Sequence, residues 1–322
     1  MRMIRLGRTN VQVPAVSLGT WGHGGPNVSD GVSVGWSGND DNEAKNALVA
    51  AYRHGITHWD TADAYGNGHA ESLIGEVWSE VPRDEIFLAT KFGWVKGPHD
   101  HYYDAGFMRS QCERSLRLMK VNVIDLYYFH HCDFGPNDAY FEDALAMMRK
   151  LRDEGKIRFI GLSDWDLRKI MKFIDRVDPD VVQPYRNLID DDYERSGLKR
   201  YVDSHDLGGA FFSPIKHGLL LGKYDKPVQY PQGDFRSRIP EFTDAKFIDR
   251  MKSAAAEMKR KFGKEREPVL HAVIGALLAG NPNACVLLGQ RNVKQVEAAA
   301  AIGNALSADE AKWVQSVYRA TA

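Results

Sequence analysis

Four residues that together can move a proton occur in order along the first 130 positions of the sequence. Asp60 ends a short apolar run, Tyr65 follows in a glycine-containing loop, and Lys91 and His130 come later. A phenol titrates near 10, so a tyrosine that acts as a general acid at neutral pH needs a pKa lowered by about 3 units, or ~4 kcal/mol. Burial alone would raise that pKa. A nearby cation is therefore required.

Lys91 is the candidate cation, because it lies at the end of the apolar run 88–91. One positive charge about 4 Å from the phenol supplies roughly 4 kcal/mol at an effective dielectric near 20. A buried ammonium needs a carboxylate partner to stay charged, and Asp60 can be that partner. His130 can orient a carbonyl group by a hydrogen bond. The chemistry predicted by these four residues is protonation of a carbonyl oxygen by Tyr65.

Alternating strand-like and helix-like segments must position these residues. Apolar runs predict strands at residues 15–18, 57–60, 86–91, 123–130, 158–163, 181–187, 209–215 and 284–289. Helical spacing is typical of residues 41–54, 70–78, 107–119, 139–154, 167–177, 193–204, 268–279, 293–302 and 308–318. Eight units without a linker favour one α/β domain over residues 1–322, a (β/α)8 TIM barrel. A β-hairpin at residues 4–13 is expected to plug one end.

In such a barrel the carboxyl ends of the strands meet at one mouth. Polar residues that end or follow the later predicted strands are expected there as well, namely Ser163, Asp164, Gln183, Asn187, Ser213 and Gly289. The long segment 216–243, rich in Gly, Pro, Tyr and Arg, follows the seventh predicted strand. A loop of that length in a compact domain is usually functional or disordered.

Composition narrows the classes of partner. The chain has 322 residues, 43% of them hydrophobic and 26% charged, with a formal net charge of −1. This balance gives no basic field for nucleic acid or an anionic membrane, and no apolar stretch is long enough to span a bilayer. No signal-type segment precedes the folded pattern. The three cysteines, Cys112, Cys132 and Cys285, lack metal-type spacing, which favours a reducing compartment, and we expect the cytoplasm. The oligomeric state is not readable.

The ordered motifs resemble the aldo-keto reductase family along the chain, from the hairpin to the last predicted helix. The matching segments are Leu18-Gly19-Thr20-Trp21, Asp60-Thr61-Ala62 with Tyr65-Gly66, residues 71–75, Ala89-Thr90-Lys91, residues 124–127 leading to His130, residues 155–158 and 160–163, Gln183, Ser213-Pro214 with residues 218–220, and residues 289–295. The resemblance implies a (β/α)8 barrel and NAD(P)H-dependent carbonyl reduction or alcohol oxidation. It also implies a catalytic tetrad of Asp60, Tyr65, Lys91 and His130.

By the same resemblance, a nicotinamide dinucleotide would lie across the barrel mouth. The implied cofactor contacts are Gly19, Thr20, Trp21, Ser163, Asp164, Gln183, Ser213, Pro214, Gly218, Gly289, Arg291 and Gln295, with Phe212 or Ser213 in place of a stacking aromatic residue. Asp164 stands where many relatives have asparagine, and a carboxylate can only accept a hydrogen bond from the carboxamide. Ala298 and Ala299 replace a Glu-Asn pair near the adenine. Arg291, with Lys294, can pair with a 2′-phosphate, so NADP is expected, with NAD as the alternative.

The substrate is expected to be a sugar or a small aldehyde, bound by Trp21, Trp94, His130 and His131. Neighbouring strand residues point to opposite faces, so only one of the two histidines can enter the mouth, and His131 also fits a structural role. Trp36 and Trp165 fit a substrate wall or packing equally well.

Other functions compete with this interpretation. His58 and Asp60 share a strand face, as in metal-dependent hydrolase barrels, although no metal is expected. Cys132 fits a packed thiol better than a nucleophile. Asp63 fits a loop cap or a substrate contact. The main alternative is a cofactor-binding regulatory subunit that resembles potassium-channel β-subunits.

Overall fold

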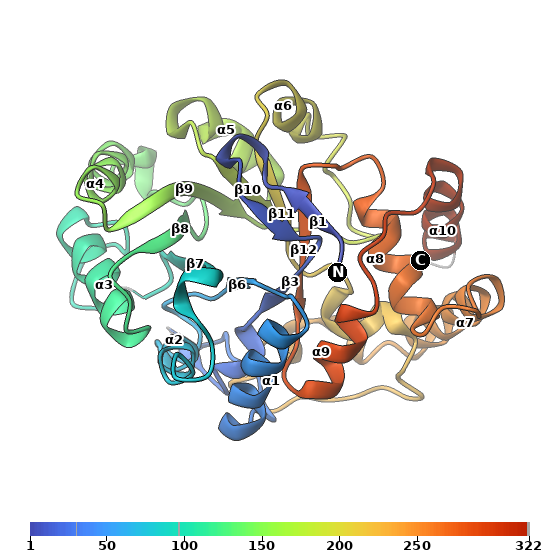
Figure 1. Cartoon of the computed structure of the whole chain (residues 1–322). Coiled ribbons are helices and arrows are strands. Elements are labelled where there is room, and N and C mark those ends of the chain that lie inside the picture. The colour runs from blue at the N-terminus through green and yellow to red at the C-terminus, as the bar shows by residue number, and fades with distance from the viewer. Residues whose placement is uncertain (30, 96, 321–322) are drawn as a thin grey trace.

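Eight parallel strands form a closed barrel at the centre of the molecule. The computed structural model describes residues 1–29, 31–95 and 97–320. The strands are β3 (Val16–Gly19), β6 (His58–Asp60), β7 (Phe87–Phe92), β8 (Ile124–Phe129), β9 (Ile157–Asp164), β10 (Val181–Pro184), β11 (Gly208–Phe211) and β12 (Ala284–Gly289). They close in the order β10-β11-β12-β3-β6-β7-β8-β9, and Figure 1 shows helices surrounding the ring. The predicted (β/α)8 TIM barrel is confirmed.

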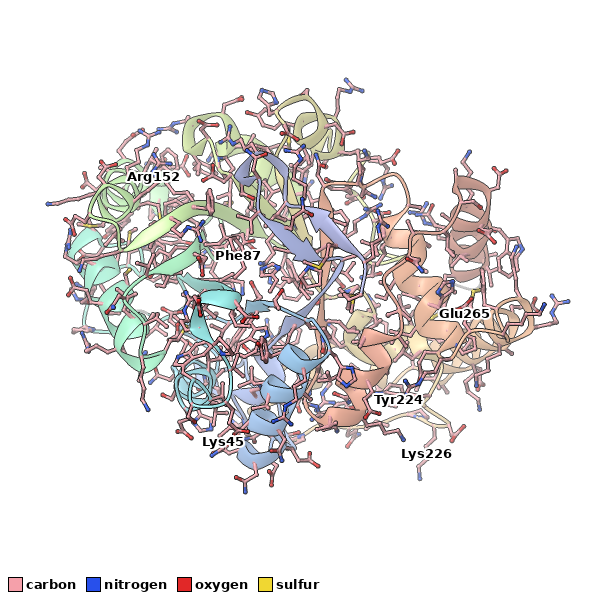
Figure 2. All side chains as sticks on the ribbon, in the orientation of Figure 1. Lys45, Phe87, Arg152, Tyr224, Lys226 and Glu265 are labelled. Carbon is pink, nitrogen blue, oxygen red and sulfur yellow. The ribbon has the colours of Figure 1, made fainter. Side chains whose placement is uncertain are left out.

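Ten α-helices lie outside the barrel in the described part of the chain. They are α1 (Asp41–Arg53), α2 (His69–Gly75), α3 (Ala105–Leu118), α4 (Phe141–Asp153), α5 (Leu167–Val177), α6 (Leu198–Ser204), α7 (Ala245–Lys261), α8 (Pro268–Leu278), α9 (Val293–Ala300) and α10 (Ala308–Ala320). Figure 2 places Lys45 and Arg152 on these outer helices and Phe87 among the barrel strands, where it is buried. Apolar residues of the strands and the helices are buried together in one core.

The predicted set of helices omits α7 and begins α6 too early. Phe247, Met251 and Met258 recur at helical spacing behind the N-cap Asp244, so the signal for α7 is present in the sequence. Helix α6 begins five residues later than predicted, at Leu198, because Gly197 adopts a left-handed φ of 85°. That conformation is not compatible with a helix running through from residue 193.

Two predicted strands are also too long. The segments 181–187 and 209–215 leave the barrel at Pro184 and Phe211. Ser213 has a φ of 55°, a left-handed conformation that ends the extended chain, and Pro214 follows it. The residues at these positions therefore belong to mouth loops and not to strands.

The predicted N-terminal hairpin is present. Strand β1 (Met3–Arg5) pairs antiparallel with β2 (Gln12–Pro14). The Arg5 guanidinium donates to both carboxylate oxygens of Asp206, at 2.7 and 2.5 Å, just before β11 begins. The Arg8 amide donates to the carbonyl of Asp206. The hairpin therefore lies at the amino-terminal end of the strands, opposite the mouth.

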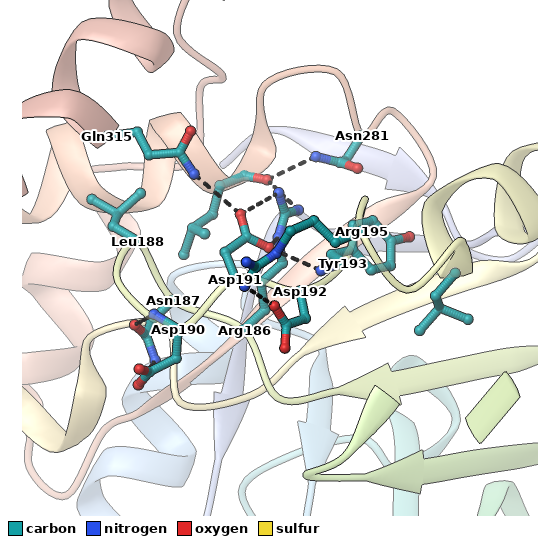
Figure 3. A network of polar contacts seen from close by, with 12 residues as sticks. Arg186, Asn187, Leu188, Asp190, Asp191, Asp192, Tyr193, Arg195, Asn281 and Gln315 are labelled. Atoms are coloured by element: carbon teal, nitrogen blue, oxygen red, sulfur yellow. Dashed lines mark hydrogen bonds and ion pairs between the residues drawn. The ribbon is translucent and has the colours of Figure 1, made fainter. Parts of the chain in front are cut away.

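A polar network joins the loop after β10 to the C-terminal helices (Figure 3). The buried guanidinium of Arg186 lies 3.0 Å from Asp191, and Gln315 of α10 donates to the same carboxylate at 3.3 Å. The side-chain oxygen of Asn187 accepts the amides of Ile189 and Asp190. Asn187, which was expected at the mouth, therefore shapes this loop.

No helix in the described ranges is long and apolar enough to cross a membrane.

Close packing of neighbouring strands can be tested at Gly161 of β9. A Cβ atom added there would lie 2.1 Å from the Tyr128 ring on β8. We expect Gly161→Ala to destabilise the protein by about 1–3 kcal/mol, because overpacked cores strain their neighbours. Urea unfolding measures the change. Gly289→Ala in β12 is the control, since nothing lies within 4 Å of its added Cβ. Equal stability of both variants would contradict the expectation.

Candidate active site

The centre of the barrel mouth holds a buried lysine bound to an aspartate and a tyrosine. Lys91 Nζ, at the end of β7, lies 2.5 Å from Asp60 Oδ1 at the end of β6. The same nitrogen donates to the Thr61 carbonyl at 2.7 Å and lies 3.4 Å from the Tyr65 hydroxyl. Lys91 is only 1% exposed, so its hydrogen bonds replace those it would make with water. The structure thus brings three of the four predicted catalytic residues into direct contact.

The net effect on the phenol differs from the predicted lowering of its pKa. Burial raises the pKa of Tyr65 above its ordinary value, and the nearby Lys91 opposes that shift without overcoming it. Asp60 also raises it, because the carboxylate that keeps Lys91 charged cancels part of the lysine field. Asp60 and Tyr65 in turn outweigh burial and raise the pKa of Lys91. In this structure Tyr65 is therefore a protonated donor beside a charged ammonium.

His130 completes the group. Its amide donates to the Phe92 carbonyl at 3.0 Å, directly after β8. Its ring stands edge-on to Tyr65, with centroids 5.9 Å apart. Burial, reinforced by the charge of Lys91, holds the pKa of His130 well below its ordinary value. A neutral imidazole has one donor and one acceptor nitrogen, so it can hydrogen-bond a carbonyl oxygen.

A cavity of about 850 Å³ opens above Tyr65 and His130. Five large aromatic side chains form part of its walls, namely Trp21, Trp94, Trp165, Phe212 and Phe235. The expected substrate residues Trp21 and Trp94 are therefore in place. Trp165 lines the same cavity, in agreement with the substrate-wall alternative.

His131 lies elsewhere. It is not among the described residues that line the cavity, and its Nε2 lies 2.6 Å from the Gly93 carbonyl. Its Nδ1 accepts the Asp133 amide at 3.2 Å. Backbone groups thus occupy both ring nitrogens, which favours the structural alternative over the expected substrate contact.

A narrower groove of about 160 Å³ adjoins the cavity and runs past Asp60 and Tyr65. Ten of the twelve predicted cofactor residues line it, namely Gly19, Thr20, Trp21, Gln183, Ser213, Pro214, Gly218, Gly289, Arg291 and Gln295. Ser163 faces the larger cavity instead. Residues from five different strand ends and their loops therefore converge on this groove.

Asp164 is the predicted cofactor residue that the structure places differently. It lines neither of these two spaces among the described residues, and its carboxylate accepts the amides of Cys132 and Asp166, each at 2.7 Å. A carboxylate accepts and cannot donate, so it binds the free amides of its own loops. Asp164 therefore organises the mouth loops rather than facing a nicotinamide carboxamide.

The sequence of the chain was compared with known proteins. A family model described as "Aldo/keto reductase family" matches residues 15–319. The chain belongs to this family. It is 28% identical over its full length to the aldo-keto reductase YhdN of Bacillus subtilis, of which it covers 95%. It is 29% identical to the L-galactose dehydrogenase of Arabidopsis thaliana, with 91% of this chain and 85% of that protein covered. A solved glycerol dehydrogenase, AKR11B4 from Gluconobacter oxydans, superposes with a TM-score of 0.79 at 27% identity, covering 98% of this chain and 94% of that one.

Membership of the family establishes the general activity. This aldo/keto reductase is an NAD(P)-dependent oxidoreductase that interconverts a carbonyl and an alcohol.

Two mouth loops of this reductase are fastened together beside the groove. The Gly35 and Asn27 amides both donate to the Gly233 carbonyl, and the Phe235 amide donates to Gly35. Asp234 accepts from the Ser37 amide at 2.8 Å and pairs with Arg236 at 2.7 Å. Although burial raises the pKa of Asp234, Arg236 and Ser37 lower it to about 2. The loops are therefore joined by backbone hydrogen bonds and by the Asp234 carboxylate, which stays charged across physiological pH.

Sequence reasoning left segment 216–243 as either functional or disordered and did not name the residues that face the site. His217, Lys223 and Arg236 line the narrow groove, and Phe235 lines the cavity. Ser213, Lys216 and His217 are non-glycine residues with positive φ, and such strain is frequent at functional sites. The arginine, tyrosine and glycine content of the segment was the available signal. Which of those residues face inward depends on the loop conformation.

The alternative chemistries concern residues with other partners. His58 Nδ1 lies 3.0 Å from Ser17 Oγ, and no group of three metal-binding side chains occurs within the described ranges. Cys132 is buried, burial raises the pKa of its thiol well above the ordinary value, and its Sγ lies 3.6 Å from the Ser163 carbonyl. Asp63 is 1% exposed and lies outside the cavity lining. These three residues contribute to packing around the site.

A buried carboxyl group lies behind the loop that carries Tyr65, and its pKa is shifted. Glu71 of α2 is fully buried and accepts a hydrogen bond from Thr90 Oγ1 at 2.8 Å. Burial raises the pKa of Glu71 from 4.5 to about 7, although Thr90 opposes the shift. The pKa of neighbouring Asp63 is also raised, by burial first and then by the charge of Glu71. Burial therefore disfavours the charged form of both groups in the folded protein.

The raised pKa of Glu71 predicts a pH-dependent stability difference. Between pH 4.5 and about 7 the folded state keeps a proton that the unfolded state has lost, so stability falls as pH rises. Glu71→Gln cannot ionise and keeps an acceptor for Thr90. At pH 8 we expect the free energy of unfolding of the variant to exceed that of the natural protein by up to about 3 kcal/mol. Near pH 5 the two free energies should differ little.

Urea unfolding at pH 5 and pH 8 measures the difference in free energy of unfolding between each variant and the natural protein. Glu80→Gln, at an exposed position in the loop after α2, is the matched control. The free energy of unfolding of this control should differ from that of the natural protein by the same amount at both pH values. If the stability difference between Glu71→Gln and the natural protein were the same at pH 5 and pH 8, the role of burial would be refuted.

Proposed function

We propose that Tyr65 is the proton donor to the carbonyl oxygen and the proton acceptor in the reverse direction. The observation that carries this proposal is the chain of contacts from Asp60 through Lys91 Nζ to the Tyr65 hydroxyl at the cavity floor, at 2.5 and 3.4 Å. A developing alkoxide is a stronger base than a phenolate, so a protonated Tyr65 can release its proton as the reaction proceeds. Lys91 stabilises the phenolate that remains.

In this scheme Asp60 is a positioning residue that keeps Lys91 charged and fixes its direction. Gln183 Nε2 donates to the second Asp60 oxygen at 2.9 Å, so both carboxylate oxygens are bound. His130, neutral and facing the cavity, would donate a hydrogen bond to the same carbonyl oxygen. Two donors would then converge on the oxygen where negative charge develops.

The narrow groove suits a nicotinamide dinucleotide. Arg291 and Lys223 line it, and neither has a carboxylate partner within the described ranges, which leaves two cations for phosphate groups. Gln183 and Ser163 lie near the reacting end, and Gly289 and Gln295 near the other. A bound nicotinamide would supply hydride to the carbonyl carbon or accept it from the alcohol. We propose NADP as the preferred form, because the planar Arg291 guanidinium matches a 2′-phosphate.

The substrate is proposed to be a small aldehyde or a sugar. Aromatic walls suit apolar rings and the faces of sugars. Relatives named as an L-galactose dehydrogenase and a glycerol dehydrogenase support polyhydroxylated compounds. The three cysteines are free and buried, which supports a reducing compartment such as the cytoplasm. An enzyme is favoured over a regulatory subunit because the cavity gives a carbonyl compound access to Tyr65.

Removing the phenol hydroxyl tests the catalytic scheme. We expect Tyr65→Phe to lower kcat for a good aldehyde substrate by about 10²–10⁴, because a positioned general acid contributes that much. Coenzyme binding, followed by fluorescence titration, should persist. Tyr52→Phe on α1 is the matched control, since Tyr52 bonds Glu85 on the outer surface. Turnover by Tyr65→Phe at the natural rate would refute the scheme.

Coenzyme preference is tested at Arg291. We expect Arg291→Gln to weaken NADPH binding about 10- to 100-fold and NADH binding much less, because a charge-assisted hydrogen bond contributes roughly 1.5–3 kcal/mol. Titration with each coenzyme gives both dissociation constants. Lys264→Gln is the matched control, as Lys264 is exposed and is not among the described groove residues. An equal loss for both coenzymes would argue against a 2′-phosphate site.

A further inference from the structure

One guanidinium at the cavity rim has no partner that explains its position. Arg238 ends the 3-10 helix Phe235–Arg238, is exposed, and lines the 850 Å³ cavity. Its guanidinium carbon lies 5.4 Å from the centroid of the Phe235 ring. Within the described part of the chain it makes no ion pair or hydrogen bond through its side chain. The guanidinium of Arg236, two residues earlier, by contrast forms an ion pair with Asp234.

The cavity around Arg238 contains no opposing charge among its described residues. No aspartate or glutamate lines it, and the other basic side chains are His99 and His130. His99 already lies 3.5 Å from Asp104, and His130 is neutral. Asp60, below the cavity floor, is paired with Lys91. The field at the rim therefore favours an anion.

Aromatic rings connect the proton donor to this cation. The Tyr65 and Trp21 rings stack with centroids 6.0 Å apart, and the Trp21 and Phe235 centroids lie 4.9 Å apart. The guanidinium carbon of Arg238 then lies 5.4 Å from the Phe235 centroid. The Trp165 ring also stacks on Phe235, with centroids 5.6 Å apart. A ligand that follows this wall has its carbonyl at Tyr65 and its far end at Arg238.

We propose that Arg238 selects carbonyl substrates that carry a carboxylate at the end remote from the reacting carbonyl. The guanidinium presents two parallel N–H donors, which match the two oxygens of a carboxylate. The substrate class would then be aldehyde acids with an aromatic or sugar body, held between aromatic walls. This inference rests on the proposed placement of the carbonyl at Tyr65.

The test compares compounds that differ only in the charged group. The natural enzyme, Arg238→Gln, Arg238→Lys and the exposed control Lys226→Gln are assayed with coenzyme on 4-formylbenzoate and its neutral methyl ester. A second pair, D-glucuronate and D-glucose, distinguishes a sugar body from an aromatic one. Lys226 lies in the same long loop and is not among the described residues of either space.

We expect the natural enzyme to prefer each acid over its neutral counterpart. Arg238→Gln should lower the ratio of kcat/KM for acid over ester about tenfold, mainly through KM of the acid. Arg238→Lys should retain part of the ratio, because it keeps charge without the planar fork. Raising the salt to 0.5 M should reduce the ratio in the natural enzyme, since screening weakens exposed charge pairs. Lys226→Gln should match the natural enzyme.

Binding without turnover separates this inference from the proposed function. In Tyr65→Phe, quenching of tryptophan fluorescence gives a dissociation constant for each compound, and we expect 4-formylbenzoate to bind more tightly than its ester. The added change Arg238→Gln should abolish this difference. If the acid is bound selectively through Arg238 but no carbonyl is turned over, the carboxylate site stands and the proposed function fails. Equal use of acid and ester by the natural enzyme, or an Arg238→Gln effect of equal size on both, would overturn the inference.

Discussion

The ion pair between Lys91 and Asp60 is the constraint on which the site depends. A lysine that is 1% exposed loses its hydration, and only a carboxylate 2.5 Å away, a carbonyl and a phenol keep it charged. The barrel lowers the free-energy cost of burying this ion pair, because the adjacent strands β6 and β7 hold its two side chains in place. In their pairing Asp60 lies opposite Ala89. The same pair limits what the lysine can do. Asp60 weakens the field at Tyr65, so burial wins and the phenol remains protonated in the free protein.

Around that centre the mouth separates into two differently built spaces. The narrow groove is lined by glycines, small polar residues and cations, which suits a charged dinucleotide. The larger cavity is lined by five Trp and Phe side chains together with polar residues such as Tyr65, His130 and Arg238. The loops that divide them are fastened by Asp234, whose pair with Arg236 is formed in a buried position. Arg236 thereby stiffens the loop that presents Arg238, so two arginines in one short helix serve a structural and a ligand-facing purpose.

The buried acids behind the catalytic loop show the cost of this arrangement. Asp63 and Glu71 occupy positions from which water is excluded, and both are pushed toward the neutral form. Sites that bring charged groups together commonly sacrifice stability for geometry. Thr90 links Glu71 to the strand that carries Lys91, so this buried carboxyl group contacts the framework of the site.

Alternating apolar runs and helical segments were enough to predict the barrel and to bring Asp60, Tyr65, Lys91 and His130 to one mouth, because such runs specify βα units whose strand ends meet on one side. For segment 216–243 the length alone left two alternatives, a functional loop or a disordered one. Tertiary structure decided the direction of individual side chains. Asp164 and His131 follow predicted strands yet turn toward backbone groups, since unpaired amides and carbonyls in the mouth loops attract them. The positions of Lys223 and Arg238 likewise depend on contacts between loops far apart in sequence, and no local pattern encodes such contacts.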